Sequence, residues 1–541
     1  MSAPLAAVSF APLAVALPLL GAALAFVLRR HTGAQRAVTS STLALTLVLE
    51  VWMLAGAWRH GAQAVLLGGW APPWGISMVV DEFSSLMLVV STCVSLAVLL
   101  YASGQGMADG ERGGSISVFH PAYLILVAGV SNAFLAGDLF NLYVGFEILL
   151  TASYVLLTLG GTTARIRAAV TYVVVSVVSS VLFLLAIGMI YAATGTVNMA
   201  DLALKLGEVA PGTQVVLHLM LFVAFGIKAA VFPLSFWLPD SYPTAPAPVT
   251  AVFAGLLTKV GVYAMVRTET LLFPGDRINS LLMVVALLTM LVGILGAVAQ
   301  TDVKRMLSFT LTSHIGFMVF GLAVGNVVGL AAAVYYVAHH IIVQTSLFLV
   351  TGLIERRGGS SNVDRLGSLA RLSPVLAVLF FIPAMNLAGI PPFSGFLGKL
   401  GLIQGGVELG TPLGWVLVGG SVATSLLTLL AVARVWNRAF WRKAEDAENP
   451  APVLLATTSS GSPMTTYGTA ANSGSRGDSA LLPRGMVVPT AALVSLGVAL
   501  TVFAGPLFQL SEQAARQMLE RTPYIEAVFG AEATYAPGSL K

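Results

Sequence analysis

Apolar stretches of about twenty residues recur along the whole chain, and they constrain its fold more than any other feature. A helix needs about 20 apolar residues to cross the roughly 30 Å hydrocarbon core of a bilayer. Hydrophobic residues make up 57% of the chain and charged residues only 10%, whereas soluble proteins have about 25% charged residues. A soluble fold could not hide this much apolar surface, so the sequence predicts an all-α integral membrane protein.

About fourteen stretches are long enough to cross the bilayer, and each predicts a transmembrane helix. They cover residues 4–28, 38–57, 80–102, 119–136, 138–159, 168–192, 213–239, 243–267, 278–300, 305–323, 328–354, 374–405, 412–435 and 485–506. The first stretch has no preceding basic segment and no clear cleavage site, which favours a retained span over a signal peptide. Residues 58–79 alternate in polarity and predict a small hairpin outside the membrane.

Charge and cysteine content exclude several classes of function. Lys and Arg are spread over many short loops without a basic patch, which argues against nucleic acid as a partner. When the N-terminus is placed outside, most of these residues fall in inner loops, so both termini are predicted outside. The single cysteine, Cys93, and the lack of a glycine-rich nucleotide motif predict no disulfide, redox cofactor or ATP site.

A short internal echo predicts two interrupted helices. The segment Pro-Leu-Ser-Phe-Trp-Leu begins at Pro233, and Pro-Phe-Ser-Gly-Phe-Leu begins at Pro392, directly after Pro391. Proline removes a backbone hydrogen bond and breaks a helix inside a membrane span. Paired breaks of this kind indicate an inverted-repeat transporter with its site near the middle of the membrane.

Four ionisable residues have long apolar flanks on both sides. They are Glu147, Lys228, Lys259 and Lys399. A charge at such a position costs roughly 2.5–3.5 kcal/mol on insertion scales, so it indicates function. Burial disfavours the charged form of both amines and carboxyl groups, which suits them to proton exchange. The alternative is a structural ion pair or a misplaced span end, and a break near Gly395 makes this alternative stronger for Lys399.

Three histidines lie in neighbouring spans and are candidates for a proton relay. His314 lies in the tenth stretch, and His339 and His340 are adjacent in the eleventh. Neutral imidazole relays protons at little cost, although a hydrogen-bonded structural histidine is the alternative. Gln344 and its neighbours add polar groups one turn further along, which favours a hydrated path. No metal site is predicted, because no third ligand has suitable spacing.

Other ionisable residues receive simpler interpretations. Glu50 is also intramembrane but has no visible partner in the sequence. Asp81 and Glu82 open the third stretch and are interpreted as interfacial helix caps. His120 and His218 stand at the beginnings of spans and are interpreted as structural.

Several of these segments resemble a known family. GDLFNLYVGFEILLTASYVLL (137–157), TGTVNMADL (194–202) and LPDSYPTAPAPVTAVFAGLLTKVGVYAMVRT (238–268) resemble the D subunits of Mrp-type multisubunit Na+/H+ antiporters. DVKRMLSFTLTSHIGF (302–317) and AGIPPFSGFLGK (388–399) are similar to the wider antiporter-like superfamily. That superfamily includes the large membrane subunits of respiratory complex I and of membrane-bound hydrogenases. The resemblance covers about residues 70–435.

The resemblance implies a specific architecture. It implies fourteen helices, two inverted five-helix repeats, and breaks in the seventh and twelfth helices. On this division, residues 1–118 hold helices 1–3, residues 119–268 the first repeat, and residues 278–435 the second. A Ser/Thr/Gly-rich loop at 443–484 is expected to be disordered, and residues 485–541 hold the last helix and tail.

The resemblance also implies roles for the buried residues. It implies a Glu147–Lys228 pair, a central Lys259, a relaying histidine in the tenth or eleventh span, and a terminal Lys399. Relatives often carry a lysine one turn after the histidine of the eleventh span, where this chain has Gln344. Two adjacent histidines leave open which one matches the histidine of the family.

The leading hypothesis is a subunit of a proton-driven antiporter for Na+ or another monovalent cation. It would work in the bacterial plasma membrane with other membrane subunits, would need no cofactor, and would not be an enzyme. One alternative is a proton-pumping subunit of a redox-driven complex related to complex I or to a membrane-bound hydrogenase. A second alternative is a scaffold that binds partner subunits and conducts nothing.

Overall fold

The computed structural model describes residues 7–106, 118–450, 454 and 482–530. The N-terminal helices are α1 (Leu13–Val27), α2 (Thr32–His60), α3 (Glu82–Gln105), α4 (Phe119–Leu135), α5 (Leu139–Thr158) and α6 (Thr163–Thr194). The central helices are α7 (Met199–Lys205), α8 (Pro211–Ala229), α9 (Leu238–Ser241), α10 (Ala247–Val252), α11 (Thr258–Arg267), α12 (Asn279–Val298), α13 (Val303–Val324) and α14 (Val327–Gly358). The C-terminal helices are α15 (Leu369–Leu372), α16 (Pro374–Ala388), α17 (Ser394–Leu409), α18 (Pro412–Val435), α20 (Arg484–Val502), α21 (Ala504–Glu520) and α22 (Thr522–Phe529).

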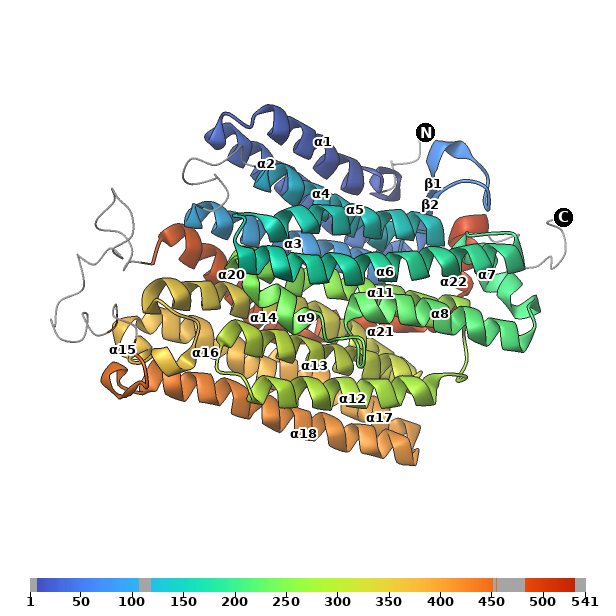
Figure 1. Ribbon diagram of the computed structural model, residues 1–541. Helices are drawn as coiled ribbons and strands as arrows, with labels where there is room; N and C mark the ends of the chain where they lie inside the picture. The colour runs from blue at the N-terminus through green and yellow to red at the C-terminus, as the bar shows by residue number, and fades with distance from the viewer. Residues whose placement is uncertain (1–6, 107–117, 451–453, 455–481, 531–541) are drawn as a thin grey trace.

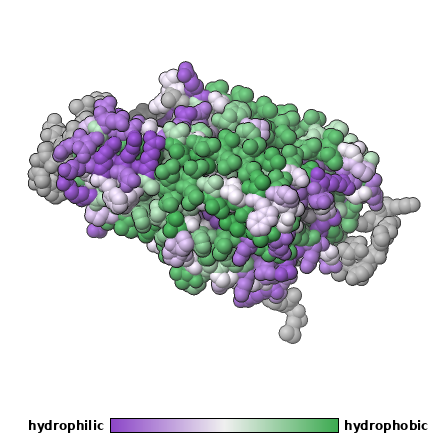
Figure 2. Space-filling view, turned by 90° about the horizontal axis from the view of Figure 1, so that it is seen from below, coloured by the Kyte–Doolittle hydropathy of each residue, from purple (hydrophilic) through white to green (hydrophobic). Residues whose placement is uncertain are grey.

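The long helices lie side by side with their axes roughly parallel (Figure 1). Among the described residues, twelve helices are long and apolar enough to cross a membrane, and α4 and α16 are shorter apolar helices. Figure 2 shows an apolar belt on one face of the molecule, with hydrophilic residues gathered at its two ends. These features confirm the predicted all-α membrane fold. Most of the predicted polar loop at 443–484 lies outside the described residues.

A two-stranded hairpin joins α2 to α3. Strand β1 (Gln63–Leu66) pairs antiparallel with β2 (Ser77–Val80), with Gln63 opposite Val80. The hairpin predicted over 58–79 is therefore confirmed, and β2 extends one residue further. At the end of β2, Asp81 caps α3 by accepting a hydrogen bond from the backbone N–H of Ser84 at 2.8 Å.

Both predicted helix interruptions are present, and they shorten two predicted spans. The stretch 213–239 is divided between α8 and α9, and the stretch 374–405 between α16 and α17. The residues that directly follow α8 and α16 are Ala230 and Gly389, both in left-handed backbone geometry with φ of 59° and 82°. Prolines follow each end and cannot continue a helix. Gly395 lies inside α17, so the second break precedes the position expected from the sequence.

Helix α14 is the centre of the bundle. It packs against α3, α10, α13, α16, α17, α20 and α21, and its most apolar stretch is completely buried. The helix on its α10 side is irregular, because a π-helical segment (Phe253–Leu257) joins α10 to α11. Since α14 carries two of the candidate histidines, this packing places them deep inside the protein.

One pair of backbone contacts recurs in the two halves of the chain. Asp138 caps α5 and forms an isolated antiparallel bridge with Asn198, and Asp302 caps α13 and forms the same bridge with Asn362. The two pairs lie at opposite ends of the bundle, where α5 and α13 begin (Figure 1). An inverted repeat would produce this arrangement, and the repeat itself stays a prediction.

Candidate functional site

Lys228 lies in the last turn of α8, where its amine has polar and aromatic neighbours but no direct ion pair with another described residue. Its Nζ donates to Oγ of Ser180 at 3.1 Å and lies 4.7 Å from the ring centroid of Phe146. Glu147 follows Phe146 in α5, and its charge interacts electrostatically with Lys228. Oε1 of Glu147 is buried and has no hydrogen-bond partner among the described residues. The structure thus places the two residues near each other without joining them.

Two cavities lead from one end of the bundle toward Lys228. The first has a volume of about 590 Å³ and is lined by Arg167, Thr171, Asp240 and Ser241, among others. The second has a volume of about 20 Å³ beside Lys228, which is enough for one water molecule. Consecutive residues line the two cavities, since Ser241 lines the first and the next residue lines the second.

Tyr242 is that next residue, and it lines the small cavity beside Lys228. It is fully buried and packs edge-on against the rings of Trp237 and Phe253. Its hydroxyl has no hydrogen-bond partner among the described residues. A buried hydroxyl without a partner costs free energy unless water reaches it, so this position favours water in the cavity beside Lys228.

Helix α11 begins directly after the π-helical segment, and Lys259 lies in its first turn. Its side chain is fully buried, and its Nζ donates to the carbonyl oxygen of Ala254 at 2.5 Å. The acceptor lies inside the π-helical segment, and such irregular turns occur frequently at functional sites. The lysine is therefore held by backbone geometry rather than by a counter-charge.

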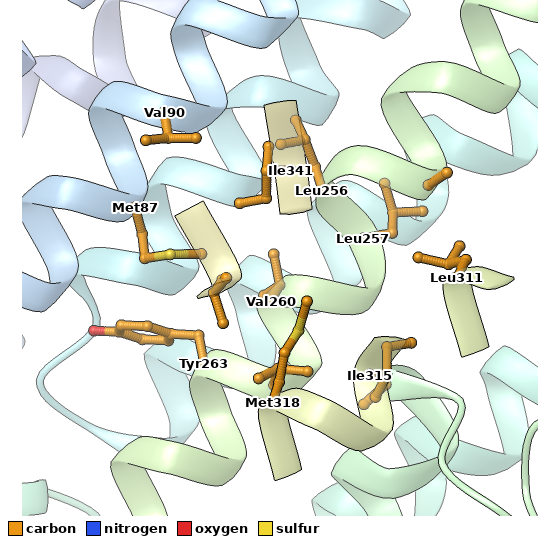
Figure 3. Close-up of a cluster of buried hydrophobic side chains, with 14 of the residues drawn as sticks. Met87, Val90, Leu256, Leu257, Val260, Tyr263, Leu311, Ile315, Met318 and Ile341 are labelled. Atoms are coloured by element: carbon orange, nitrogen blue, oxygen red, sulfur yellow. The ribbon is translucent and has the colours of Figure 1, made fainter. Parts of the chain in front are cut away.

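The helix around Lys259 is enclosed by apolar side chains. Figure 3 shows this cluster, which contains Met87, Val90, Leu256, Leu257, Val260, Tyr263, Leu311, Ile315, Met318 and Ile341. Gly261 lets α11 approach the end of α8, since a Cβ there would lie 2.7 Å from the backbone nitrogen of Ala229. The close approach brings the helices of Lys259 and Lys228 together in largely apolar surroundings.

Three aromatic side chains from α13 and α14 continue from Lys259 into the second half. The hydroxyl of Tyr336 lies 2.7 Å from Nδ1 of His314, and the ring of His340 lies 5.1 Å from that of His314 between centroids. His340 interacts electrostatically with both Lys259 and Lys399. Nε2 of His314 and both ring nitrogens of His340 have no partner among the described residues. These nitrogens are therefore free to accept or donate protons.

His339 points to the break between α16 and α17. Its Nδ1 lies 2.9 Å from Oγ of Ser394, and that hydroxyl donates to Oδ1 of Asn386 at 3.2 Å. Its ring centroid is 5.3 Å from that of Tyr336. The adjacent histidines therefore have different environments, since His340 lies toward Lys259 and His339 toward the break.

Lys399 follows the same break in the sequence, and its amine binds to the backbone that the break exposes. Its Nζ donates to the carbonyl oxygens of Leu387 and Ala388 at 3.1 and 3.0 Å, and lies 4.8 Å from the ring centroid of Phe317. Leu387 and Ala388 are the last residues of α16, whose carbonyls have no partner within the helix. Ending α16 early therefore creates the acceptors for a buried cation at the negative end of the helix dipole.

The structure brings most of the predicted site residues into one buried row, which we call the polar line. It comprises Lys228, Lys259, His340, His314, Tyr336, His339, Ser394 and Lys399, with Glu147 beside its first member. Gln344 is not part of the polar line, because its Nε2 donates to the carbonyl oxygen of Leu307 at 2.7 Å. Within the described ranges, no three His, Cys, Asp or Glu residues are placed to hold a metal ion.

Several members were missed from the sequence. Tyr336 precedes His339 and His340 by three and four residues, so helical spacing alone could have placed it on their face. Ser394 lies inside the internal echo, which also could have singled it out. Ser180, Asn386 and Tyr242 had no sequence signal, because only tertiary packing brings them to the line.

Two residues interpreted as structural have further partners. Asp81 caps α3 as expected, but it also forms an ion pair with Arg267 at 2.6 Å. His218 was interpreted as structural, and its Nε2 lies 2.6 Å from Oε1 of Glu269 in a partly buried pair. Both pairs join residues far apart in the sequence, so local patterns could not reveal them.

Comparisons with known proteins show the family of the chain. Residues 136–428 match the family described as NADH:quinone oxidoreductase/Mrp antiporter, transmembrane. A Na+/H+ antiporter D subunit from Alkalihalophilus pseudofirmus is 37% identical over 519 residues, which covers 95% of this chain and 98% of that protein. A chain in the structure of the Mrp complex from Dietzia sp. DQ12-45-1b is 32% identical with a TM-score of 0.86, and the match covers 96% of this chain and 99% of that one.

A chain of respiratory complex I from Thermus thermophilus shares the fold, with a TM-score of 0.74 at 24% identity over 94% of this chain and 99% of that one. The resemblance inferred from the sequence motifs is confirmed. The chain belongs to the NADH:quinone oxidoreductase/Mrp antiporter family of transmembrane proteins and, within it, to the D subunits of Na+/H+ antiporters.

Proposed function

We propose that this chain is a membrane subunit of a proton-driven antiporter that exchanges H+ for Na+ or another monovalent cation. The observation that carries the proposal is the polar line, a row of buried amines, imidazoles and hydroxyls across an otherwise apolar bundle. Ionisable groups inside a membrane mark ion or proton pathways. Membership of the antiporter D subunits supports the same function.

The 590 Å³ cavity connects the line to one side of the membrane. Protons pass Tyr242 between this cavity and the water-sized cavity beside Lys228, where Ser180 and the nearby Glu147 help to orient the amine. A negative Glu147 favours a charged Lys228, and a neutral Glu147 favours transfer of the proton onward. The pair therefore regulates loading of the line.

Lys259 is the switch at the centre of the line. Its amine is held by one carbonyl in apolar surroundings, so a charged state there is unfavourable without a neighbouring proton acceptor. The free ring nitrogens of His340 and His314 supply that acceptor. Tyr336 and His339 connect these nitrogens to Lys399.

Lys399 is the terminal group of the line. The carbonyls at the end of α16 stabilise its charged form, so it holds a proton until the break between α16 and α17 becomes hydrated. The helix breaks at Pro233 and at Pro391 and Pro392 act in the same way in the two halves of the chain. Each break leaves backbone groups inside the membrane without a partner in the helix, so that these groups can bind a proton carrier or water.

The family and the exposed apolar surface support a place in the membrane within a multisubunit complex. We infer that the chain works in the bacterial plasma membrane beside other membrane subunits, with both termini outside. Residues 119–268 and 278–435 form two inverted repeats, each ending in a half-channel. We infer that the chain is a transporter subunit and not an enzyme.

A second candidate function is proton pumping in a redox-driven complex, which the shared fold with a complex I chain keeps open. The two functions differ in what drives the polar line rather than in the line itself. A purified complex that oxidises NADH or reduces a quinone would establish the second function.

The test is cation-dependent proton flux in membrane vesicles that contain the assembled complex. Lys259→Ala is expected to abolish exchange while assembly on a native gel stays normal. Lys205→Ala is the matched control, because that lysine is partly exposed and bonded to Asp201 at 2.8 Å. Full exchange by an assembled Lys259→Ala complex would instead identify the chain as a scaffold.

A further inference from the structure

Glu50 is a buried carboxyl group that the polar line does not use. It lies in α2 and is 0% exposed, although the neighbouring Val48 and Val51 on the same helix are 69% and 48% exposed. The helix is apolar and long enough to cross the membrane. An ionisable group at such a position indicates a function of its own.

Two hydroxyl groups from neighbouring helices face the carboxyl group of Glu50. Oγ of Ser131 in α4 lies 3.5 Å from Oε1, and the hydroxyl of Thr92 in α3 lies against the same group. Both residues are at most 1% exposed. Oε2 of Glu50 and Oγ1 of Thr92 have no hydrogen-bond partner within the part of the chain that the structure describes.

No described charged group interacts with this carboxyl group. An unpaired buried charge is far too costly to persist, and buried carboxylates are paired, protonated or bound to a cation. Glu50 must therefore carry either a proton or a cation. The hydroxyl oxygens beside it are the kind of ligand that hard cations prefer.

The spacing of the oxygens favours an ion of a particular size. The 3.5 Å between Ser131 and Glu50 is long for a hydrogen bond between oxygens, which is usually 2.5–3.0 Å. Oxygen ligands at right angles around an ion of Ca²⁺ size lie roughly 3.3–3.7 Å apart. Na+ has nearly the same radius, whereas the larger K+ needs wider spacing.

We propose that Glu50, Thr92 and Ser131 form an exchange site that binds either a proton or a Na+-sized monovalent cation. Binding of the cation releases the proton from the carboxyl group, so one positive charge replaces another. The site would bind the cation whether or not the polar line carries protons. It would bring cation recognition and proton release together in one chain.

The test uses dicyclohexylcarbodiimide, which adds to protonated carboxyl groups in apolar surroundings and gives a stable N-acylurea. Membranes with the assembled complex are treated with the reagent, and the peptide that contains Glu50 is analysed by mass spectrometry. Labelling is expected without Na+, and NaCl should reduce it at least tenfold relative to choline chloride at equal ionic strength. The adduct should be absent from Glu50→Gln.

Variants of the hydroxyl ligands separate a cation site from a simple proton site. Thr92→Val keeps the reactive carboxyl group but should raise the half-protecting Na+ concentration roughly tenfold or more, since even supporting contacts of metal sites are worth 10–100-fold. Ser91→Ala is the matched control, because the hydroxyl of Ser91 bonds to Leu88 of its own helix at 2.9 Å. It should leave the protection unchanged.

Labelling that Na+ leaves unchanged, or equal protection in the wild type and Thr92→Val, would assign Glu50 to a proton alone and overturn the proposal. If Glu50 does not react with the reagent, the Na+-dependent rise in melting temperature decides, because a bound ligand stabilises the folded state. That rise should be larger in the wild type than in Glu50→Gln, and an equal rise would reject the site. Neither measurement depends on transport, so either result is independent of the proposed antiport.

Discussion

The hydroxyl of Tyr336 lies 2.7 Å from Nδ1 of His314, and this contact joins α14 to α13 at the middle of the polar line. Both side chains are fully buried. The contact fixes one ring nitrogen of His314 and leaves Nε2 free. A single hydroxyl thus assigns different roles to the two nitrogens, because Nδ1 faces Tyr336 and Nε2 stays free to accept a proton.

Replacing Tyr336 by Phe is expected to reduce cation-dependent proton flux at least tenfold, since a positioned proton-transfer group typically contributes 10²–10⁴-fold. The ring and its packing are kept, so assembly should be normal. Flux in vesicles and a native gel of the same membranes measure the two effects.

A buried tyrosine outside the polar line provides the control for this variant. Tyr101 in α3 is fully buried, and its hydroxyl donates to the carbonyl oxygen of Leu349 at 3.1 Å. Tyr101→Phe should therefore keep nearly full flux. Equal loss of flux in both variants would show that the bundle, rather than the hydroxyl of Tyr336, is responsible.

Ser394→Ala tests the contact between His339 and the helix break. The hydroxyl of Ser394 donates to Asn386, so it accepts from Nδ1–H of His339 and leaves Nε2 as the proton acceptor. Without it the tautomer is no longer fixed. We expect a severalfold lower flux and a changed pH profile, with rescue by Ser394→Thr.

Ser346→Ala is the matched control for this variant. Ser346 in α14 is buried like Ser394 in α17. Its hydroxyl, however, donates to the carbonyl oxygen of Ile342 in its own helix at 2.7 Å. Its removal should leave the pH profile of transport as in the wild type. A purely structural role of Ser394 would lower the flux without moving that profile.

The sequence was sufficient for the helices and for the charged members of the polar line. Apolar stretches must cross the membrane as helices because every backbone group needs an internal partner, and the buried charges stand out against them. Pro233 and Pro392 likewise predicted the two breaks, because the loss of a backbone donor is a local property.

The partners of these residues could not be read from the sequence. Glu147 and Lys228 were expected to pair, whereas Lys228 donates to Ser180 on a third helix. Lys399 takes backbone carbonyls as its acceptors, and backbone groups carry no sequence signal. Contacts of this kind depend on how helices pack, which single-sequence patterns do not specify.

Gly293→Ala is expected to destabilise the protein. A Cβ at Gly293 in α12 would lie 2.5 Å from the backbone nitrogen of Ser313, directly before His314 in α13. The two helices must separate to relieve the overlap, which typically costs about 1–3 kcal/mol. The melting temperature of the purified complex, followed by tryptophan fluorescence, should fall.

Gly419 in α18 provides the comparison, because no atom lies within 4 Å of a Cβ placed there. Gly419→Ala should keep or raise the melting temperature, since alanine in a helix is more stable than glycine by about 0.5–1 kcal/mol. A fall as large as that of Gly293→Ala would contradict the role of close packing between α12 and α13.

The buried ion pair between Asp81 and Arg267 predicts strong coupling between α3 and α11. The charged atoms lie 2.6 Å apart, and both side chains are at most 8% exposed. Arg267→Met should destabilise the protein by about 3–5 kcal/mol, because it leaves a buried carboxylate unpaired. Adding Asp81→Asn should recover much of this loss, since asparagine keeps the cap of α3 without the charge.

An exposed pair on α21 gives the reference for this experiment. Arg516 and Glu512 lie 2.6 Å apart, but their side chains are 59% and 51% exposed. Arg516→Met should change stability by less than about 1 kcal/mol, and adding Glu512→Gln should change it little further. Thermal unfolding of all four variants measures both couplings. If the double variant at Asp81 and Arg267 were no more stable than Arg267→Met, the loss would come from the packing of the arginine rather than from the unpaired charge.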